Sequence, residues 1–166
     1  KPPSWAVRSV KLPPKGIRSR QLFIGKKIAD GNTRGRVIEI HPTLPTTRMH
    51  TLNLKIRKGE VQSDTDRDIL KIVVVDRHSG HGNVGTAFVK GFGLKSGALG
   101  SSVAHDHHNL IVVGTSDREI LAAIQHLHEM QGGLITVRDG KLTGQLPLPI
   151  AGLLSDYPVD EVVKQL

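Results

Sequence analysis

Two nearly continuous runs of aliphatic, mostly β-branched residues constrain the fold more than any other feature of the chain. They are residues 70–75 (LKIVVV) and residues 110–114 (LIVVG). Successive side chains of a strand point to opposite faces of a sheet, so a run of this kind is typical of a strand that is buried on both faces. The two runs therefore predict strands inside a well-covered sheet.

Other patterns predict further strands. Residues 51–56 alternate between apolar and polar side chains, which indicates a half-buried strand. Residues 134–138 and 141–146 flank Asp139-Gly140, a dipeptide typical of a two-residue hairpin turn. Shorter strands are expected at residues 22–24, 36–40 and 86–90.

One helix has clear start and stop signals. Ser116 and Glu119 form a capping-box pattern, in which both side chains accept hydrogen bonds from backbone donors at a helix start. Gly132-Gly133 is typical of a helix end. The apolar stripe between these signals comprises Ile120, Ile124, Leu127 and Met130, with Leu121 beside it. We also expect a short helical turn at residues 150–154 and an amphipathic helix at residues 158–166.

The order of these elements predicts an α/β (α+β) sandwich, in which a mixed β-sheet has helices packed on it. A chain of 166 residues is long enough for one hydrophobic core, but not for two large domains. We expect residues 1–35 to form a Pro-containing basic arm or linker with a short strand. Residues 36–166 are expected to form a single α/β domain. Because the chain starts with Lys1 rather than Met, we expect it to be a piece of a longer polypeptide.

The positive charge is concentrated in the arm. Residues 1–36 contain ten Lys or Arg residues and one acidic residue, whereas the other 130 residues contain thirteen basic and fourteen acidic residues. Such an arm could contact phosphates, be a solvated linker, or cover an acidic surface on a neighbouring domain. Aromatic residues make up only 3% of the chain and are not interleaved with the basic ones, so we do not expect nucleic-acid binding.

The sequence contains no apolar run of the roughly 20 residues that span a bilayer, and no signal-peptide core at its start. We therefore expect no contact with a membrane and a cytoplasmic location. The chain has no cysteine, so a metal site would need His, Asp or Glu ligands.

The polar segment 105–109 (HDHHN) directly precedes the second buried run and is the strongest candidate for a site. A carboxylate among imidazoles can bind a divalent metal or orient a general base, which makes His105, Asp106 and His108 candidate metal ligands. Asn109 completes the segment. The alternative is that the His and Asn side chains only hold the loop in place through hydrogen bonds to the backbone.

A second polar loop follows the first buried run. His78 and Asn83 lie in the glycine-rich segment 78–85, and two such loops at the ends of adjacent strands could converge. The alternative is a glycine turn with solvent-facing histidines. The glycine spacing does not match a dinucleotide loop, and the sequence contains neither G-x-S-x-G nor H-E-x-x-H. Asp64, Asp66 and Asp68 lack the glycine and glutamate of a calcium loop and predict a solvated turn or a helix start.

Several segments in order resemble a known domain. They are DRDILKIVVVDRH, GNVG, VKGFGLKSGALGSSVAHDHHNLIVVG and GGLITVRDGKLTGQLPLPIAGLLSD. Together they closely resemble the C-terminal domain of adenine deaminases of the amidohydrolase superfamily, most strongly over residues 64–156. The family motif HDSHN is matched by His105, Asp106, His108 and Asn109, whereas His107 replaces its serine.

The resemblance implies an enzyme that hydrolyses adenine to hypoxanthine and ammonia in adenine catabolism and purine salvage. It also implies a divalent metal, typically manganese, that activates water in a (β/α)₈ barrel. That barrel is absent from these 166 residues. We expect this domain to pack on the barrel, to be inactive alone and to belong to a homo-oligomer.

Our candidates for the rim of the purine site are His78, Asn83, His105, Asp106, His108 and Asn109. The alternative function is a free-standing binding or scaffold module that uses its basic arm to engage an acidic partner.

Overall fold

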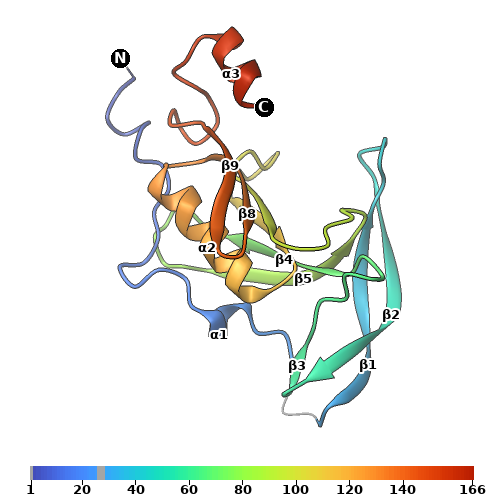
Figure 1. Cartoon of the computed structure of the whole chain (residues 1–166). Helices are drawn as coiled ribbons and strands as arrows, with labels where there is room; N and C mark the ends of the chain where they lie inside the picture. The colour runs from blue at the N-terminus through green and yellow to red at the C-terminus, as the bar shows by residue number, and fades with distance from the viewer. Residues whose placement is uncertain (1, 26–28) are drawn as a thin grey trace.

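The computed structural model describes residues 2–25 and 29–166. Its strands form one mixed sheet in the order β3-β2-β1-β5-β4-β7-β6-β8-β9 (Figure 1). β1 and β5 pair parallel, and the other neighbouring strands pair antiparallel. The strands are β1 (Gly31–Ile40), β2 (Thr47–Arg57), β3 (Glu60–Val61), β4 (Leu70–Val75), β5 (Val84–Lys90), β6 (Ala98–Ser101), β7 (Leu110–Gly114), β8 (Gly133–Arg138) and β9 (Lys141–Pro147). The predicted α+β sandwich with a mixed sheet is thus confirmed.

The two buried runs form the centre of the sheet. They are β4 and β7, which pair with each other, and both faces of β4 carry buried side chains. Val73 and Val75 point toward helix α2 (Asp117–Glu129), whereas Leu70 packs on the opposite face with Val89 and Val113.

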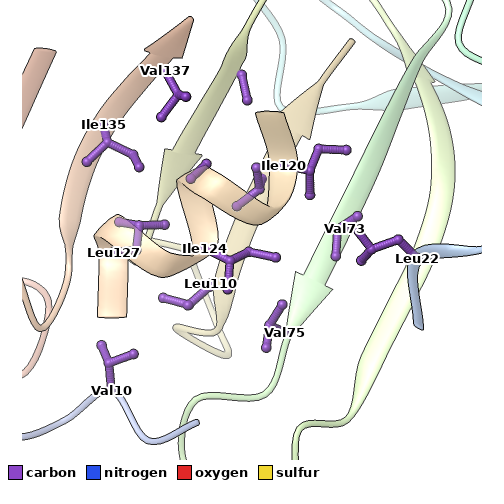
Figure 2. Close-up of a cluster of buried hydrophobic side chains, with 13 residues drawn as sticks. Val10, Leu22, Val73, Val75, Leu110, Ile120, Ile124, Leu127, Ile135 and Val137 are labelled. Carbon is purple, nitrogen blue, oxygen red and sulfur yellow. The ribbon is translucent and has the colours of Figure 1, made fainter. Parts of the chain in front are cut away.

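Helix α2 lies across one face of the sheet and supplies the largest part of the core (Figure 2). The predicted stripe is confirmed, since Ile120, Ile124 and Leu127 are all buried. Ser116 caps the helix by accepting a hydrogen bond from the Glu119 backbone N–H at 3.4 Å. The Glu119 carboxylate, however, accepts from the Gly140 N–H at 3.1 Å, so it fixes the β8–β9 turn instead of completing a capping box.

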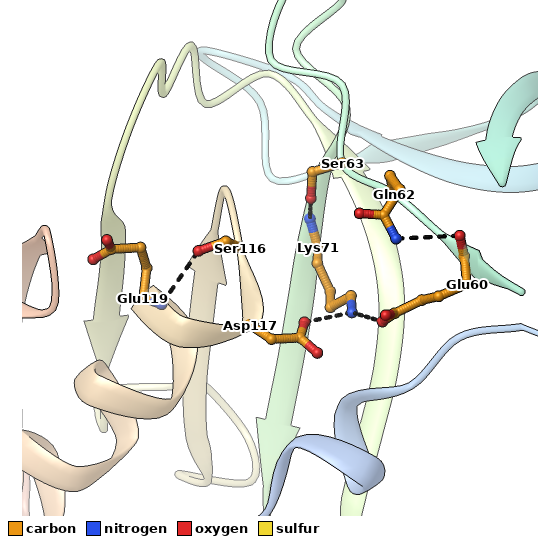
Figure 3. Close-up of polar contacts among 7 residues, drawn as sticks. All are labelled: Glu60, Gln62, Ser63, Lys71, Ser116, Asp117 and Glu119. Atoms are coloured by element: carbon orange, nitrogen blue, oxygen red, sulfur yellow. Dashed lines mark hydrogen bonds and ion pairs between the residues drawn. The ribbon is translucent and has the colours of Figure 1, made fainter. Parts of the chain in front are cut away.

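A buried ammonium joins α2 to the other half of the sheet. Lys71 on β4 contacts Asp117 at 2.5 Å and Glu60 on β3 at 2.7 Å (Figure 3). Its side chain is only 5% exposed, so the two carboxylates provide the compensation that a buried charge requires.

Residues 22–24 were predicted to be a strand, and this is wrong. The segment Ser19–Leu22 is the short helix α1. The Gln21 side chain accepts a hydrogen bond from the Arg18 N–H, a local contact that favours a helical turn, and Leu22 is fully buried in the core under α2.

Strand β6 was not among the predicted strands, because its segment is punctuated by glycines. Its Gly100 faces α2, where a Cβ would lie 2.9 Å from Leu127. Before it, Gly97 has φ +85°, and a Cβ there would meet the Val137 carbonyl oxygen. These glycines therefore allow close packing, a role that composition alone cannot distinguish from loop flexibility.

Residues 150–154 form a tight turn and not the expected helical turn. Ala151 and Gly152 both have left-handed φ values, and Ile150 and Leu154 form an isolated bridge. Helix α3 (Val159–Gln165) then forms as predicted for residues 158–166, but it buries no side chain.

The arm lies on the body of the protein. Val10 is buried in the core cluster, and its backbone N–H donates to the Gln131 side chain at 3.1 Å. β1 begins at Gly31, five residues before the predicted boundary at residue 36. The division into residues 1–35 and 36–166 stays a prediction. No helix within residues 2–25 and 29–166 is long and apolar enough to span a membrane.

Candidate functional site

The two polar loops lie at the same edge of the sheet. Val75 at the end of β4 is paired with Leu110 at the start of β7, so the antiparallel register places the following and preceding loops side by side. We call residues 76–83 the glycine loop and residues 105–109 the histidine loop. His78 Nε2 lies 3.1 Å from the His107 carbonyl oxygen, which means that the two loops touch.

The histidine loop is a tight turn and not an extended segment. Asp106 and His108 have left-handed φ values of 72° and 49°. The His108 N–H donates to the Ala104 carbonyl at 2.7 Å, and the Asn109 N–H donates to His107 Nδ1 at 3.1 Å. One backbone hydrogen bond and one bond to the His107 side chain therefore order the loop.

The side chains of the histidine loop divide into two groups. His105 and Asp106 project into solvent, being 95% and 84% exposed, and form a pair with 2.8 Å between Nδ1 and Oδ1. His108 and Asn109 are half-buried. Their Nδ1 and Oδ1 atoms are buried and have no hydrogen-bond partner within the part of the chain that the structure describes.

A metal site does not assemble from the three predicted ligands. Within residues 2–25 and 29–166, no three His, Asp or Glu side chains come together in a way that could hold a metal ion. The left-handed residues 106 and 108 turn the chain so that His105 and Asp106 face solvent while His108 Nδ1 is covered. The residues present therefore do not fit a metal ion.

Asp76 organises the glycine loop. Its carboxylate accepts hydrogen bonds from the Ser79 hydroxyl, from the backbone N–H groups of His78 and Ser79, and from the Asn83 amide. The Ser79 hydroxyl is the main cause that lowers the pKa of Asp76 from 3.8 to about 2. Asn83 thus faces its own loop, whereas His78 reaches across to the histidine loop.

A buried arginine that the sequence analysis did not single out contacts the backbone of the histidine loop. Arg77 is 2% exposed, and its Nε donates to the His108 carbonyl. Its two terminal nitrogens donate to Ser9, at 3.1 Å to the carbonyl and 3.0 Å to the hydroxyl, and to the Ala151 carbonyl at 2.9 Å. Desolvation lowers the pKa of Arg77. One guanidinium therefore joins the arm, the histidine loop and the turn at residues 150–154.

Arg77 was missed because its signal is weak. It stands shortly after a buried strand and directly after Asp76, in a position that many solvated loop arginines occupy. Its partners are backbone carbonyls from residues 68 and 74 positions away, which only the folded chain brings together.

Comparison with known proteins identifies the family. Residues 45–166 match the family model described as the adenine deaminase C-terminal domain. The chain is 48% identical over 139 residues to an adenine deaminase of Desulfatibacillum aliphaticivorans, a match that covers 84% of this chain and 24% of that protein.

Two further adenine deaminases match in the same way. The protein of Brucella anthropi is 50% identical over 131 residues, which cover 79% of this chain and 23% of that protein. The protein of Desulforamulus reducens is 41% identical over 165 residues, which cover 99% of this chain and 26% of that protein. The chain thus spans about a quarter of the length of these relatives. It belongs to the adenine deaminase C-terminal domain family.

Proposed function

We propose that this chain works as the C-terminal domain of an enzyme that hydrolyses adenine with water to hypoxanthine and ammonia. The observation that carries the proposal is the 41% identity to the Desulforamulus reducens adenine deaminase over nearly the whole chain. The partner of the domain is then the preceding catalytic part of the same polypeptide, expected to be an amidohydrolase barrel. Family membership gives no support to the alternative of a free-standing scaffold module.

The divalent metal, expected to be manganese, belongs to the preceding part in this proposal. The described residues of this chain offer no three-ligand group, so no step of the reaction is assigned to a metal held here. The isolated chain is accordingly inactive. A cytoplasmic location, a homo-oligomeric enzyme and a role in adenine catabolism and purine salvage belong to the same proposal and rest on the family resemblance.

The histidine loop contributes to the rim of the purine site in this proposal. His105 and Asp106 have free access to a ligand, because both are largely exposed on a loop whose backbone is fixed. An imidazole and a carboxylate can together donate to and accept from the edge of a purine. His78 and Asn83 hold the two loops in place, since His78 contacts the His107 carbonyl and Asn83 contacts Asp76 of its own loop. His108 and Asn109 are half-buried in the histidine loop.

The direct test joins this chain to the preceding part of the Desulforamulus reducens enzyme. Ammonia release from adenine is measured with added manganese for the chimera and for the isolated 166-residue chain. We expect turnover by the chimera and none by the isolated chain. Turnover by the isolated chain would show that catalysis does not need the preceding part.

The rim role is tested in the same chimera. His105→Ala and Asp106→Asn should each lower kcat/KM for adenine roughly tenfold, which corresponds to the loss of one hydrogen bond to a polar or charged group. His50→Ala is the matched control, because His50 is a partly exposed histidine on β2 that pairs with Glu39. Equal losses in all three variants would remove the rim role.

A further inference from the structure

Exposed apolar side chains gather on the segments next to the point where the chain enters the domain. Six large apolar residues of the two terminal segments are each more than half exposed: Trp5, Leu154, Tyr157, Val159, Val163 and Leu166. The Ala6 carbonyl accepts a hydrogen bond from the Ala151 N–H at 2.6 Å, which holds the start of the arm against the turn at residues 150–154. The N-terminus and helix α3 lie at the same end of the molecule (Figure 1).

An apolar groove continues this surface along the sheet. The groove has a volume of about 450 Å³ and lies on the face opposite α2, where Leu99, Ile111 and Leu134 line its floor. Gln165 and Leu166 at the end of α3 form part of its wall. None of the described residues that line it is charged, and most of them are apolar, so it fits a largely apolar, uncharged counterpart.

Helix α3 has little packing that would explain its apolar side chains, since Val159 and Val163 are more than half exposed and Val162 is only half-buried. It spans seven residues and buries none of them. Helices of this length are not stable in water without tertiary contacts, and apolar residues at both ends and in the middle of such a segment favour a helix that packs against a partner.

We infer that α3, the exposed residues beside it and the groove form the docking face for the preceding part of the same polypeptide. This inference rests on the proposed function. The matched family is a C-terminal domain, and the matched segments are only 23 to 26% of the relatives, so most of each relative's chain precedes this domain and enters it through the arm. Covalent attachment beside Trp5 places that part next to the docking face at a high effective concentration.

The position of the histidine loop agrees with this arrangement. Arg77 ties the loop to Ser9 of the arm and to Ala151, which are both adjacent to the docking face. Docking there would bring His105 and Asp106 close to the preceding part, whereas docking on the β1–β2 hairpin would not use these connections.

The test is a cleavable form of the chimera described above, with a protease site directly before Lys1. After cleavage, the two pieces are analysed by size-exclusion chromatography and sedimentation velocity. We expect them to stay associated. The double variant Tyr157→Asp, Val163→Asp should raise the Kd at least tenfold. Both side chains are exposed, and unchanged thermal unfolding of the isolated variant chain confirms that it still folds.

The matched control is Leu44→Asp, Met49→Asp, which introduces the same charges at exposed apolar residues of the β1–β2 hairpin. It should leave the Kd unchanged within about twofold, as expected for surface substitutions outside an interface. The inference is overturned if the unmodified pieces separate, or if the hairpin variant separates them and the docking-face variant does not. It is also overturned if the isolated chain forms a dimer that only the docking-face variant breaks, because the occupant is then a second copy.

Adenine turnover by the uncut chimera separates this inference from the proposed function. An active chimera whose pieces fall apart contradicts the docking face and leaves the function intact. A chimera whose pieces stay docked but which releases no ammonia contradicts the function and leaves the docking face intact.

Discussion

The guanidinium of Arg77 makes more connections between distant segments than any other side chain described here, so its replacement should be costly. Arg77→Lys keeps the charge but loses the planar fork that reaches His108, Ser9 and Ala151 together. We expect a loss of about 3 kcal/mol in the free energy of unfolding, because buried carbonyls lose charged donors. Urea unfolding measures it.

The control is Arg138→Lys on β8, where the arginine is exposed and the change should cost less than about 0.5 kcal/mol. Gly152→Ala should lower the free energy of unfolding as Arg77→Lys does, because Gly152 has φ +69° and a Cβ there would lie 2.9 Å from Arg77 Nη1. A stability of Arg77→Lys equal to that of Arg138→Lys would mean that the guanidinium contacts contribute little.

Asp76 gives the glycine loop a dependence on pH. Its pKa in the folded protein is about 2, below the usual 3.8, so the folded state binds fewer protons than the unfolded state between these values. Its contribution to loop order is complete above about pH 4 and is lost as the pH falls through about 2. A carboxyl-carbon NMR titration measures this pKa directly.

Ser79→Ala provides the comparison for that titration. It removes the hydroxyl that is the largest cause of the shift, so the midpoint of Asp76 should move upward toward 3.8. The backbone N–H donors of His78 and Ser79 remain in this variant, and the pKa should therefore stay below its usual value. An unchanged midpoint would assign the shift to the backbone donors and the Asn83 amide.

At the scale of elements, the ammonium of Lys71 fixes how the start of α2 meets β3 and β4. Glu60→Gln or Asp117→Asn leaves the ammonium with one carboxylate, and each should cost about 1 kcal/mol. The double variant leaves a buried charge with no carboxylate and should cost about 3–5 kcal/mol, more than the two single changes together. A double-mutant cycle by urea unfolding measures the coupling.

The stability of Lys71→Met should be compared with that of the Glu60→Gln, Asp117→Asn double variant. This substitution removes the buried charge and keeps a side chain of similar length, while both carboxylates remain 22 to 24% exposed and accessible to water. It should therefore be less destabilising than the double variant. If Lys71→Met is the worst of the set, the ion pairs themselves, and not the avoidance of an unpaired charge, dominate the energetics.

Sequence patterns predicted the elements whose signals are local. The buried runs became β4 and β7, the Asp-Gly turn became the β8–β9 hairpin, and the stripe after Ser116 became α2. The failures have tertiary causes. Strand β6 was missed because a glycine usually indicates a loop, whereas Gly100 is needed here for the close approach of Leu127. Leu22 was misassigned because it reaches the core from a helical turn, which the apolar run 22–24 did not indicate.

At the scale of the whole molecule, the candidate site was only partly predictable. The positions of the histidine and glycine loops next to the buried runs indicated that the loops could converge but did not decide it; in the structure His78 Nε2 contacts the His107 carbonyl. The direction of each histidine was not predictable, because it depends on the left-handed conformations of Asp106 and His108. Arg77 was not predictable at all, since its acceptors are carbonyls from both ends of the chain.

The two ends of the chain should differ sharply in what they contribute to stability. Deleting residues 1–22 removes Val10 and Leu22, which are 3% and 0% exposed, from the core under α2. Burial of two such side chains is worth roughly 3–6 kcal/mol, and Arg77 also loses Ser9 as an acceptor. The thermal midpoint should fall by 10 °C or more, on the order expected for a domain of this size.

Deleting residues 159–166 removes a helix with no buried side chain, so the midpoint of the isolated chain should stay within a few degrees of the original. The same deletion should release the cleaved chimera into two pieces, because α3 forms the wall of the docking face. Calorimetry of both truncated chains measures the two thermal midpoints. An unchanged midpoint without residues 1–22 would favour the predicted independence of residues 36–166, whereas the expected fall makes the arm an integral part of the core.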